Sequence, residues 1–278
     1  MKEFFGFSKH LGGYNRPVEG FLSWQHIVFI TTCVLIMIGL AVFLGLRNRN
    51  KEMKTKNKVL IWTAIIINAF EIFKIILICF RSQNAMAWKT MLPLFLCSLQ
   101  LIAIPIAAAS KGRLKEAAID FVFIYGLLGA LLGTYGAAQL YSKFPVLSFD
   151  NVVSAITHCI AGFASLYIVI SGMTSMKPKN IWLNFLILFG LCGIAYIANV
   201  IVPYNYMFLM RGEGTPYDIF YNLVGGSPVL YPMVVILLFY MYASVFYLIY
   251  FWIRKRKQKK QAQTAVIREE NQPNKSQK

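Results

Sequence analysis

Seven long apolar stretches occupy most of this 278-residue chain. Each is close to the twenty or so residues that an α-helix needs to cross about 30 Å of hydrocarbon. Helices are expected because lipid offers backbone groups no hydrogen-bond partner, and because the alternating pattern of a barrel strand is absent. The pattern therefore predicts an all-α, polytopic membrane protein built as a seven-transmembrane-helix bundle. The predicted spans are residues 24–45, 59–80, 90–109, 116–139, 151–173, 181–203 and 230–253.

Composition and charge agree with a membrane bundle. Hydrophobic residues make up 58% of the chain and charged residues 14%, whereas a soluble domain carries about a quarter charged residues. Of the 28 basic residues, 20 fall in the first, third and fifth linkers and after the last span. By the positive-inside rule these segments face the cytoplasm. The N-terminus is then predicted outside and the C-terminus in the cytoplasm.

This topology predicts a division of the chain into three parts. Residues 1–22 form an extracellular or interfacial segment, 23–253 the seven-helix transmembrane domain, and 254–278 a basic, disordered cytoplasmic tail. The net charge of +17 is explained by basic residues that set the topology and contact anionic lipid. We therefore expect membrane lipids as partners and no nucleic acid.

Cysteines and glycines exclude some classes of site. The five cysteines all fall inside or at the edge of predicted spans and form no CxxC pair, so neither a metal site nor a disulfide framework is indicated. The chain has no nucleotide-binding glycine loop, and no cofactor is expected. Gly126, Gly129, Gly133 and Gly136 recur every three or four residues, which predicts a small-residue face for close helix packing.

Polar residues within the spans cost several kcal/mol near the bilayer centre, so their positions are informative. At 1.5 Å per residue, Cys97, His158 and Lys74 lie about 10 Å below the outer boundary. The inner half of the spans has almost nothing comparable, so we expect a polar cavity reached from the outer side. The residues that define it are His26, Glu71, Lys74, Cys97, Gln100, His158 and Asn199.

Cys97 and His158 are the most suggestive pair, because they fall at one depth on two helices. A thiol beside an imidazole is the minimal arrangement for nucleophilic acyl transfer, in which the base produces a thiolate. Gln100, one turn below Cys97, is placed to donate to a developing oxyanion. Each residue also has a structural interpretation. Buried cysteine usually acts as a small hydrophobe, and the histidine is compatible with a helix–helix contact.

Two other features stay open between structural and functional interpretations. Glu71 and Lys74 stand three residues apart on one helix face, which predicts an ion pair that is either structural or part of the pocket. The longest connector, residues 204–229, contains a turn cluster followed by a predicted short interfacial helix at 217–223. A loop of this length over a cavity mouth suggests a lid, and an aromatic belt is the equal alternative.

Several segments together resemble the YwaF-type family of bacterial integral membrane proteins, over about residues 20–253. They are Leu92-Pro93-Leu94-Phe95-Leu96-Cys97-Ser98-Leu99, the stretch 144–158, Asn205-Tyr206-Met207-Phe208-Leu209 and Gly226-Ser227-Pro228. The family pattern usually has histidine where this chain has Phe95. The family is itself similar to eukaryotic seven-span proteins proposed to act as lipid acyltransferases through a cysteine. The resemblance implies a multi-pass protein of the bacterial plasma membrane, with Cys97 as acyl acceptor and His158 as its base.

Three functions are compatible with these features. The leading hypothesis is a lipid acyltransferase or acyl hydrolase with Cys97 and His158 as catalytic residues. The main alternative is a proton-coupled transporter or permease that uses Glu71, Lys74 and His158, and the third is a non-enzymatic receptor or assembly factor. Residues expected to bind substrate in the first case are His26, Glu71, Lys74, Gln100, Asn199 and Asn205.

Overall fold

The computed structural model describes residues 1–9, 13–174 and 176–270, with side chains described as far as residue 264. All named secondary structure in this part of the chain is helical, which confirms the all-α prediction. The α-helices are α1 (Trp24–Asn48), α2 (Met53–Arg81), α3 (Gln100–Ala109), α4 (Gly112–Tyr135), α5 (Ala138–Tyr141), α6 (Phe149–Ile170), α7 (Ile181–Ile201), α8 (Tyr217–Leu223) and α9 (Leu230–Glu270). Short 3₁₀ helices are η1 (Ala87–Thr90), η2 (Pro178–Asn180) and η3 (Tyr206–Phe208).

Within the described residues, six helices are long and apolar enough to cross a membrane, not the seven expected. They are α1, α2, α4, α6, α7 and α9. The predicted third span, residues 90–109, is not one continuous helix: η1 ends at Thr90, residues 91–99 form bends and turns, and only α3 is regular. Pro93 explains part of the break, because it has no backbone N–H and disfavours helical geometry in the residue before it.

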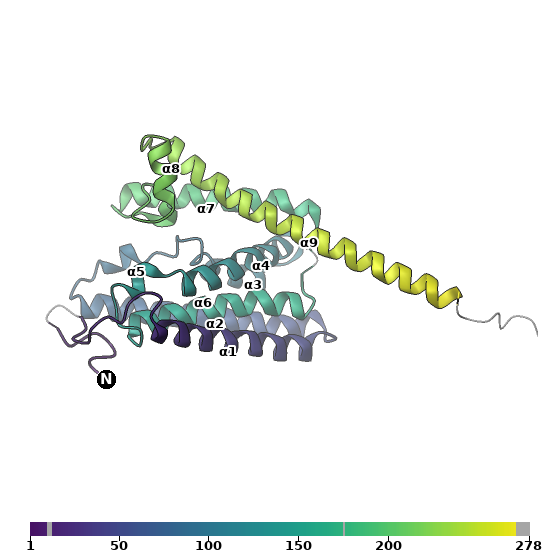
Figure 1. The fold of residues 1–278 in the computed structure, drawn as a ribbon, viewed down its shortest axis with the longest axis horizontal. Coiled ribbons are helices and arrows are strands. Elements are labelled where there is room, and N and C mark those ends of the chain that lie inside the picture. Colours follow the sequence, from purple (N-terminus) through teal and green to yellow (C-terminus); the bar gives the residue numbers. More distant parts are fainter. Residues whose placement is uncertain (10–12, 175, 271–278) are drawn as a thin grey trace, which may run out of the picture.

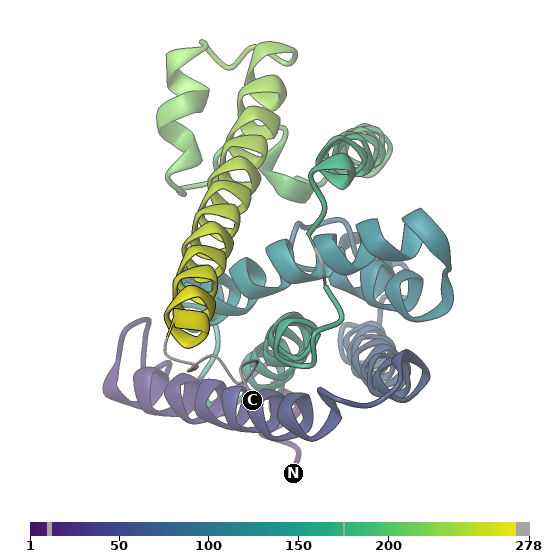
Figure 2. The same ribbon diagram turned by 90° about the vertical axis from the view of Figure 1, so that its right-hand side faces the viewer.

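Two of the six long helices, α4 and α6, form the buried centre of the bundle. In the apolar part of α4, 72% of residues are buried, and in that of α6, 50%, whereas the figure for α1 is 17%. Figures 1 and 2 show α4 between α1, α2 and α6 on one side and α7 and α9 on the other. The outer helices present large apolar side chains such as Leu35, Phe80 and Ile201 on their free faces, as lipid-facing helices do.

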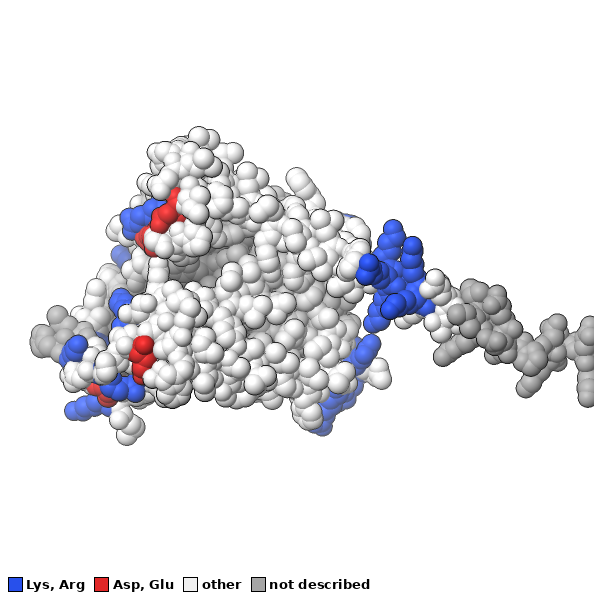
Figure 3. All heavy atoms as spheres, viewed as in Figure 1, with Lys and Arg blue, Asp and Glu red and all other residues white. Residues whose placement is uncertain are grey.

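Charged side chains gather at the two ends of the bundle and leave a neutral band between them (Figure 3). Lysine and arginine predominate at the end from which α9 projects, whereas the other end shows both signs. We call the first the basic end; it contains the linker from α1 to α2 and the segment Arg254–Lys257. This separation fits a bundle that spans a bilayer.

The last helix is longer than a membrane span. α9 contains 41 residues, about 60 Å at 1.5 Å per residue, or twice the hydrocarbon thickness. The prediction of a disordered tail from residue 254 is therefore wrong as far as Glu270, and residues 271–278 lie outside the described part. Lysine, glutamine and alanine are good helix formers, and this local preference extends the helix beyond its apolar part.

At the end opposite the basic end, the N-terminal segment folds back over the helices. Arg81, the last residue of α2, binds both carboxylate oxygens of Asp150 in the first turn of α6, at 2.7 and 2.9 Å. The Tyr14 hydroxyl donates to the same carboxylate. This buried ion pair joins two helices far apart in sequence, and the span pattern does not reveal it.

Candidate functional site

Cys97 lies in the turn that precedes α3. The amide of Leu99 donates to the Phe95 carbonyl at 3.0 Å, and the amide of Gln100 to the Cys97 carbonyl at 3.4 Å. The first amides of a helix carry partial positive charge, which stabilises an anion close to them. The break in the third apolar stretch thus brings a thiol to the positive end of a helix rather than along its side.

Glycines of α4 allow Cys97 and His158 to approach this helix closely. A Cβ added at Gly129 would lie 3.1 Å from the Cys97 Cβ, and one added at Gly133 would overlap the His158 ring. Gly126, one turn earlier, packs against the backbone of α6 at Ala161. The expected packing face is therefore present, and two of its glycines also make space for the candidate reactive side chains.

The structure brings His158 and Cys97 together. Cys97 packs at Gly129 and His158 at Gly133, one turn apart on α4, and the two side chains are close enough to interact electrostatically. Both residues are partly accessible. His158 Nδ1 is 2.7 Å from the Ser154 carbonyl oxygen. A carbonyl only accepts, so Nδ1 carries the proton in the neutral ring and Nε2 keeps a lone pair. The ring is thus oriented by one nitrogen and basic at the other.

The Glu71–Lys74 pair and Gln100, two further parts of the predicted site, have environments compatible with a role there. Glu71 and Lys74 form the expected ion pair, 2.6 Å long, and Lys74 is close enough to act electrostatically on His158. Gln100 is fully buried on the first turn of α3, and neither its amide nitrogen nor its amide oxygen has a hydrogen-bond partner among the described residues. A buried amide without a partner costs about 1–3 kcal/mol, so this side chain needs a role.

His26 has a structural environment instead. Its Nδ1 accepts from the Leu22 amide at 3.2 Å, and its Nε2 is 3.3 Å from the Thr134 carbonyl. The ring is fully buried and lies 3.9 Å from that of Tyr141, centroid to centroid. Both nitrogens are used to hold the start of α1 against α4, which leaves no group for a substrate.

Asn199 and Asn205 hold the loop that follows α7. Asn199 donates to the Tyr206 carbonyl at 3.0 Å and accepts from its amide at 2.6 Å. Asn205 likewise bonds to the backbone of Arg211 and Met210. Both asparagines use their amide oxygen and their amide nitrogen to hold backbone groups, so the structure gives them a structural role in place of the predicted contact with substrate.

The loop held by these asparagines packs on the segment that carries Cys97. The ring of Phe95 is 5.4 Å from that of Tyr206 and 5.9 Å from that of Phe208, between centroids. The Tyr206 hydroxyl also donates to the Lys89 carbonyl at 2.5 Å. Phe95 is thus part of an aromatic cluster. The short helix predicted at 217–223 is present as α8.

The expected confinement of polar residues to one half of the bundle is wrong. Asp120, on the third turn of α4 from the basic end, is buried and accepts from the Thr174 hydroxyl at 2.9 Å. Asn184 of α7 donates to the Tyr247 hydroxyl at 2.7 Å. The first contact joins α4 to the linker between α6 and α7, and the second joins α7 to α9, both towards the basic end. The sequence contains the residues but does not show that their helices converge.

Two residues of the site have no distinct signal in the sequence. Ser154 is one turn before His158, a spacing that places its carbonyl beneath the ring, and Ser98 is the next residue after Cys97 and is close enough to act on its thiol. The repeated glycine spacing of α4 is visible in the sequence, but its partners are not. Helix periodicity gives the face of each residue and leaves the neighbouring helix unspecified.

Comparison with known proteins places the chain in a family without assigning its chemistry. No curated protein and no solved structure matches it. The TMEM164 family matches over residues 21–250, close to the range of the expected resemblance. The narrower YwaF-type assignment and the similarity to acyltransferases do not follow from this match. The chain is a multi-pass membrane protein, and it belongs to the TMEM164 family.

Proposed function

We propose that this protein transfers or hydrolyses acyl groups of membrane lipids through a thioester on Cys97. The observation that carries the proposal is that Cys97 and His158 lie side by side against Gly129 and Gly133 of α4, with His158 Nδ1 fixed by the Ser154 carbonyl. A nucleophile, a base and a group that orients the base are the parts that covalent acyl transfer requires. The site lies within the apolar bundle, which suits a substrate that stays in the membrane.

The first half-reaction forms the thioester. His158 Nε2 takes the thiol proton, and the Cys97 thiolate attacks the carbonyl carbon of a lipid ester. The carbonyl electrons move to oxygen, and the Gln100 amide, three residues after Cys97 in the chain, would donate to that oxyanion. When the tetrahedral adduct collapses, the carbon–oxygen bond of the ester breaks. The leaving lysolipid alkoxide takes the proton from the imidazolium.

The second half-reaction releases the acyl group. His158 removes a proton from the hydroxyl of an acceptor lysolipid or from water, and that oxygen attacks the thioester carbonyl. The carbon–sulfur bond breaks, and the thiolate recovers its proton from His158. A lysolipid acceptor gives acyl transfer, whereas water gives hydrolysis, so the access of water to the site decides between them.

Thioester trapping tests this directly. Full-length protein in lipid vesicles is supplied with a phospholipid that carries an alkynyl acyl chain, and the label is detected after coupling. We expect a label that hydroxylamine removes, absent in Cys97→Ala and reduced about 100-fold or more in His158→Gln. Cys79→Ala is the matched control, since this half-buried thiol donates to the Ala85 carbonyl at 3.9 Å. A label unchanged in Cys97→Ala would rule the proposal out.

A proton-coupled permease is the second candidate, and one observation favours it. Polar groups occur in both halves of the bundle, with Glu71 and Lys74 near one end and Asp120 near the other. Flux of a solute that survives Cys97→Ala but is lost in Glu71→Gln would favour this function over acyl transfer. The reverse result would favour the thioester.

A further inference from the structure

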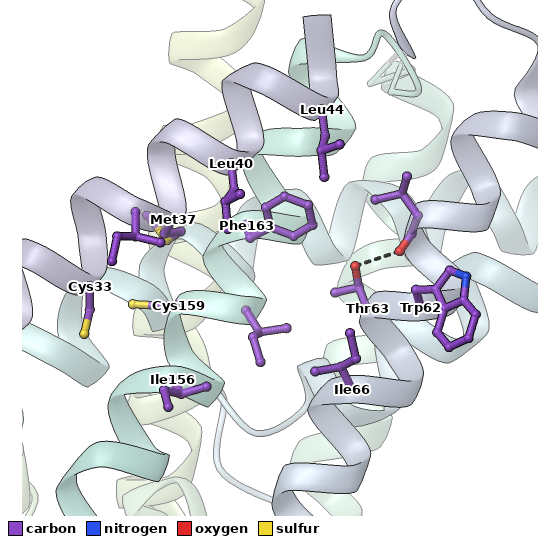
Figure 4. Close-up of a pocket in the computed structure, with 13 residues that line it drawn as sticks. Cys33, Met37, Leu40, Leu44, Trp62, Thr63, Ile66, Ile156, Cys159 and Phe163 are labelled. Atoms are coloured by element: carbon purple, nitrogen blue, oxygen red, sulfur yellow. Dashed lines mark hydrogen bonds between the residues drawn. The ribbon is translucent and has the colours of Figure 1, made fainter. Parts of the chain in front are cut away.

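A groove separate from the Cys97 site opens between α1, α2 and α6 (Figure 4). Its volume is about 440 Å³, within the range of small-molecule sites. The walls include Met37 and Leu40 of α1, Ile66 of α2, and Ile160 and Phe163 of α6. His158 lies two residues from Ile160 on α6 and so projects from the other side of that helix.

The groove is chemically suited only to an apolar occupant. The one hydroxyl in its lining, that of Thr63, already donates to the Val59 carbonyl at 2.8 Å. A cavity without polar partners does not retain water. Ile36, Leu40 and Trp62 of the lining are 58%, 50% and 63% exposed, so the groove is reached sideways, from the surface that faces lipid.

Its length fits one hydrocarbon chain of one leaflet. On α1 the lining extends from Cys33 to Leu44, a distance of eleven residue steps or about 16 Å along the helix. Half of the hydrocarbon core of a bilayer is about 15 Å. The groove therefore runs from near the bilayer centre to the basic end, where Leu44 and Val59 form its last part.

Positive charge continues both walls at that end. Arg47 stands three residues beyond Leu44 on α1, and Lys58 stands four residues before Trp62 on α2, so helical spacing keeps each on its wall of the groove. Both side chains are exposed, and neither has an ion pair or side-chain hydrogen bond within the described residues. Two such cations are complementary to a phosphate at the membrane surface.

We propose that this groove binds an anionic phospholipid of the leaflet at the basic end. One acyl chain lies between α1, α2 and α6, and the phosphate lies between Arg47 and Lys58. Bound there, the lipid fills the gap between the two outer helices and α6. This site does not depend on the thioester chemistry, because it lies on the opposite side of α6 from Cys97.

Native mass spectrometry and thermal unfolding of the full-length, delipidated protein test the proposal. Phosphatidylglycerol is expected to bind as one retained copy and to raise the unfolding temperature. Phosphatidylcholine and glycerol phosphate are expected to bind weakly, since one lacks net charge and the other lacks the chain. The double variant Arg47→Gln/Lys58→Gln should bind phosphatidylglycerol about 30-fold more weakly. Lys255→Gln/Lys257→Gln, with the same loss of charge on α9, should bind it as the unmodified protein does.

Variants that fill the groove test the position of the chain. Leu40→Trp and Ile160→Trp should remove the retained copy, and Leu40 is half exposed, so its replacement leaves the buried core intact. Ile76→Trp, at a position 61% exposed and outside the lining, is the control. Equal binding of phosphatidylcholine, or equal loss in the two charge variants, would overturn the proposal. So would a retained copy in both groove-filling variants.

Discussion

The two histidines of the bundle lie in similar places and have different environments. Both are in the half of the bundle opposite the basic end, and both use a backbone carbonyl, at 3.3 Å for His26 and 2.7 Å for His158. His26 is fully buried, and its second nitrogen accepts from an amide. His158 is partly accessible, and its second nitrogen faces a thiol.

This contrast separates a structural histidine from a candidate catalytic one. A ring with both nitrogens bonded to backbone can exchange a proton only by breaking part of the fold. A ring with one nitrogen fixed and the other directed at a nucleophile exchanges its proton without structural cost. Burial and residue type alone would assign the two histidines the same role.

Replacing each histidine by alanine should therefore give opposite results. His158→Ala is expected to lower thioester formation by about 10²–10⁴-fold, the usual contribution of a general base, with little change in unfolding temperature. His26→Ala should leave the rate per folded molecule unchanged and destabilise the protein by about 3 kcal/mol, through a cavity and two unpaired backbone groups. Trapping assays and thermal unfolding measure the two effects. Loss of rate in a folded His26→Ala protein would contradict the comparison.

A glycine substitution sharpens the comparison without touching either histidine. Gly133→Ala introduces a methyl group where the His158 ring lies, so the ring must move and thioester formation should fall about 100-fold. Gly193→Ala on α7 is the matched control, because no atom lies within 4 Å of the added carbon. That variant should keep full activity. Similar rates for the two variants would show that the ring position does not matter.

The smallest effect concerns the contact of Tyr14 with Asp150, at the end opposite the basic end. Burial, followed by the Asp150 carboxylate, raises the pKa of Tyr14 to about 12. The fold favours the protonated phenol, so this stabilisation is complete below pH 10 and is lost as pH rises through 12. Between pH 10 and pH 12 the unfolding temperature of the unmodified protein should fall. In Tyr14→Phe the fall should be smaller by a few degrees. Tyr196→Phe, which removes a hydroxyl bonded to the Pro228 carbonyl, is the control. An equal change in both variants would remove Tyr14 as the cause.

Much of the fold could be predicted because, in a membrane, an apolar stretch of about twenty residues is expected to form one helix of that length. Residues 24–45 and 151–173, for example, lie within or close to α1 and α6. The prediction for the third stretch was wrong because it relied on the same relation. Residues 90–109 have the composition of a span, but Pro93 interrupts the helical backbone. Composition does not report continuity of hydrogen bonding.

The sequence predicts how deep each candidate residue lies in the bilayer but not which side chains meet. Counting residues puts Cys97 and His158 at one level, and the structure joins them because Gly129 and Gly133 let both approach α4. The same counting selects His26, whose hydrogen bonds depend on how α1 meets α4. The ion pair between the ends of α2 and α6 gives no signal in the sequence, because each of its residues stands at the margin of a predicted span, where a charge needs no explanation.

The shortness of α3 has a consequence for any lipid that reacts here. Ten residues extend about 15 Å from the basic end, so Cys97 stands just past the middle of the hydrocarbon, about 10 Å short of the far surface. Phospholipid esters sit at the rim of the hydrocarbon rather than within it. Either the substrate sinks by that amount or the bilayer thins locally beside the short helix, at a cost of a fraction of a kcal/mol per Å. Under the proposed acyl transfer, bilayer thickness then becomes a determinant of turnover, and membranes with longer acyl chains are expected to slow the reaction without a change in any residue of the protein.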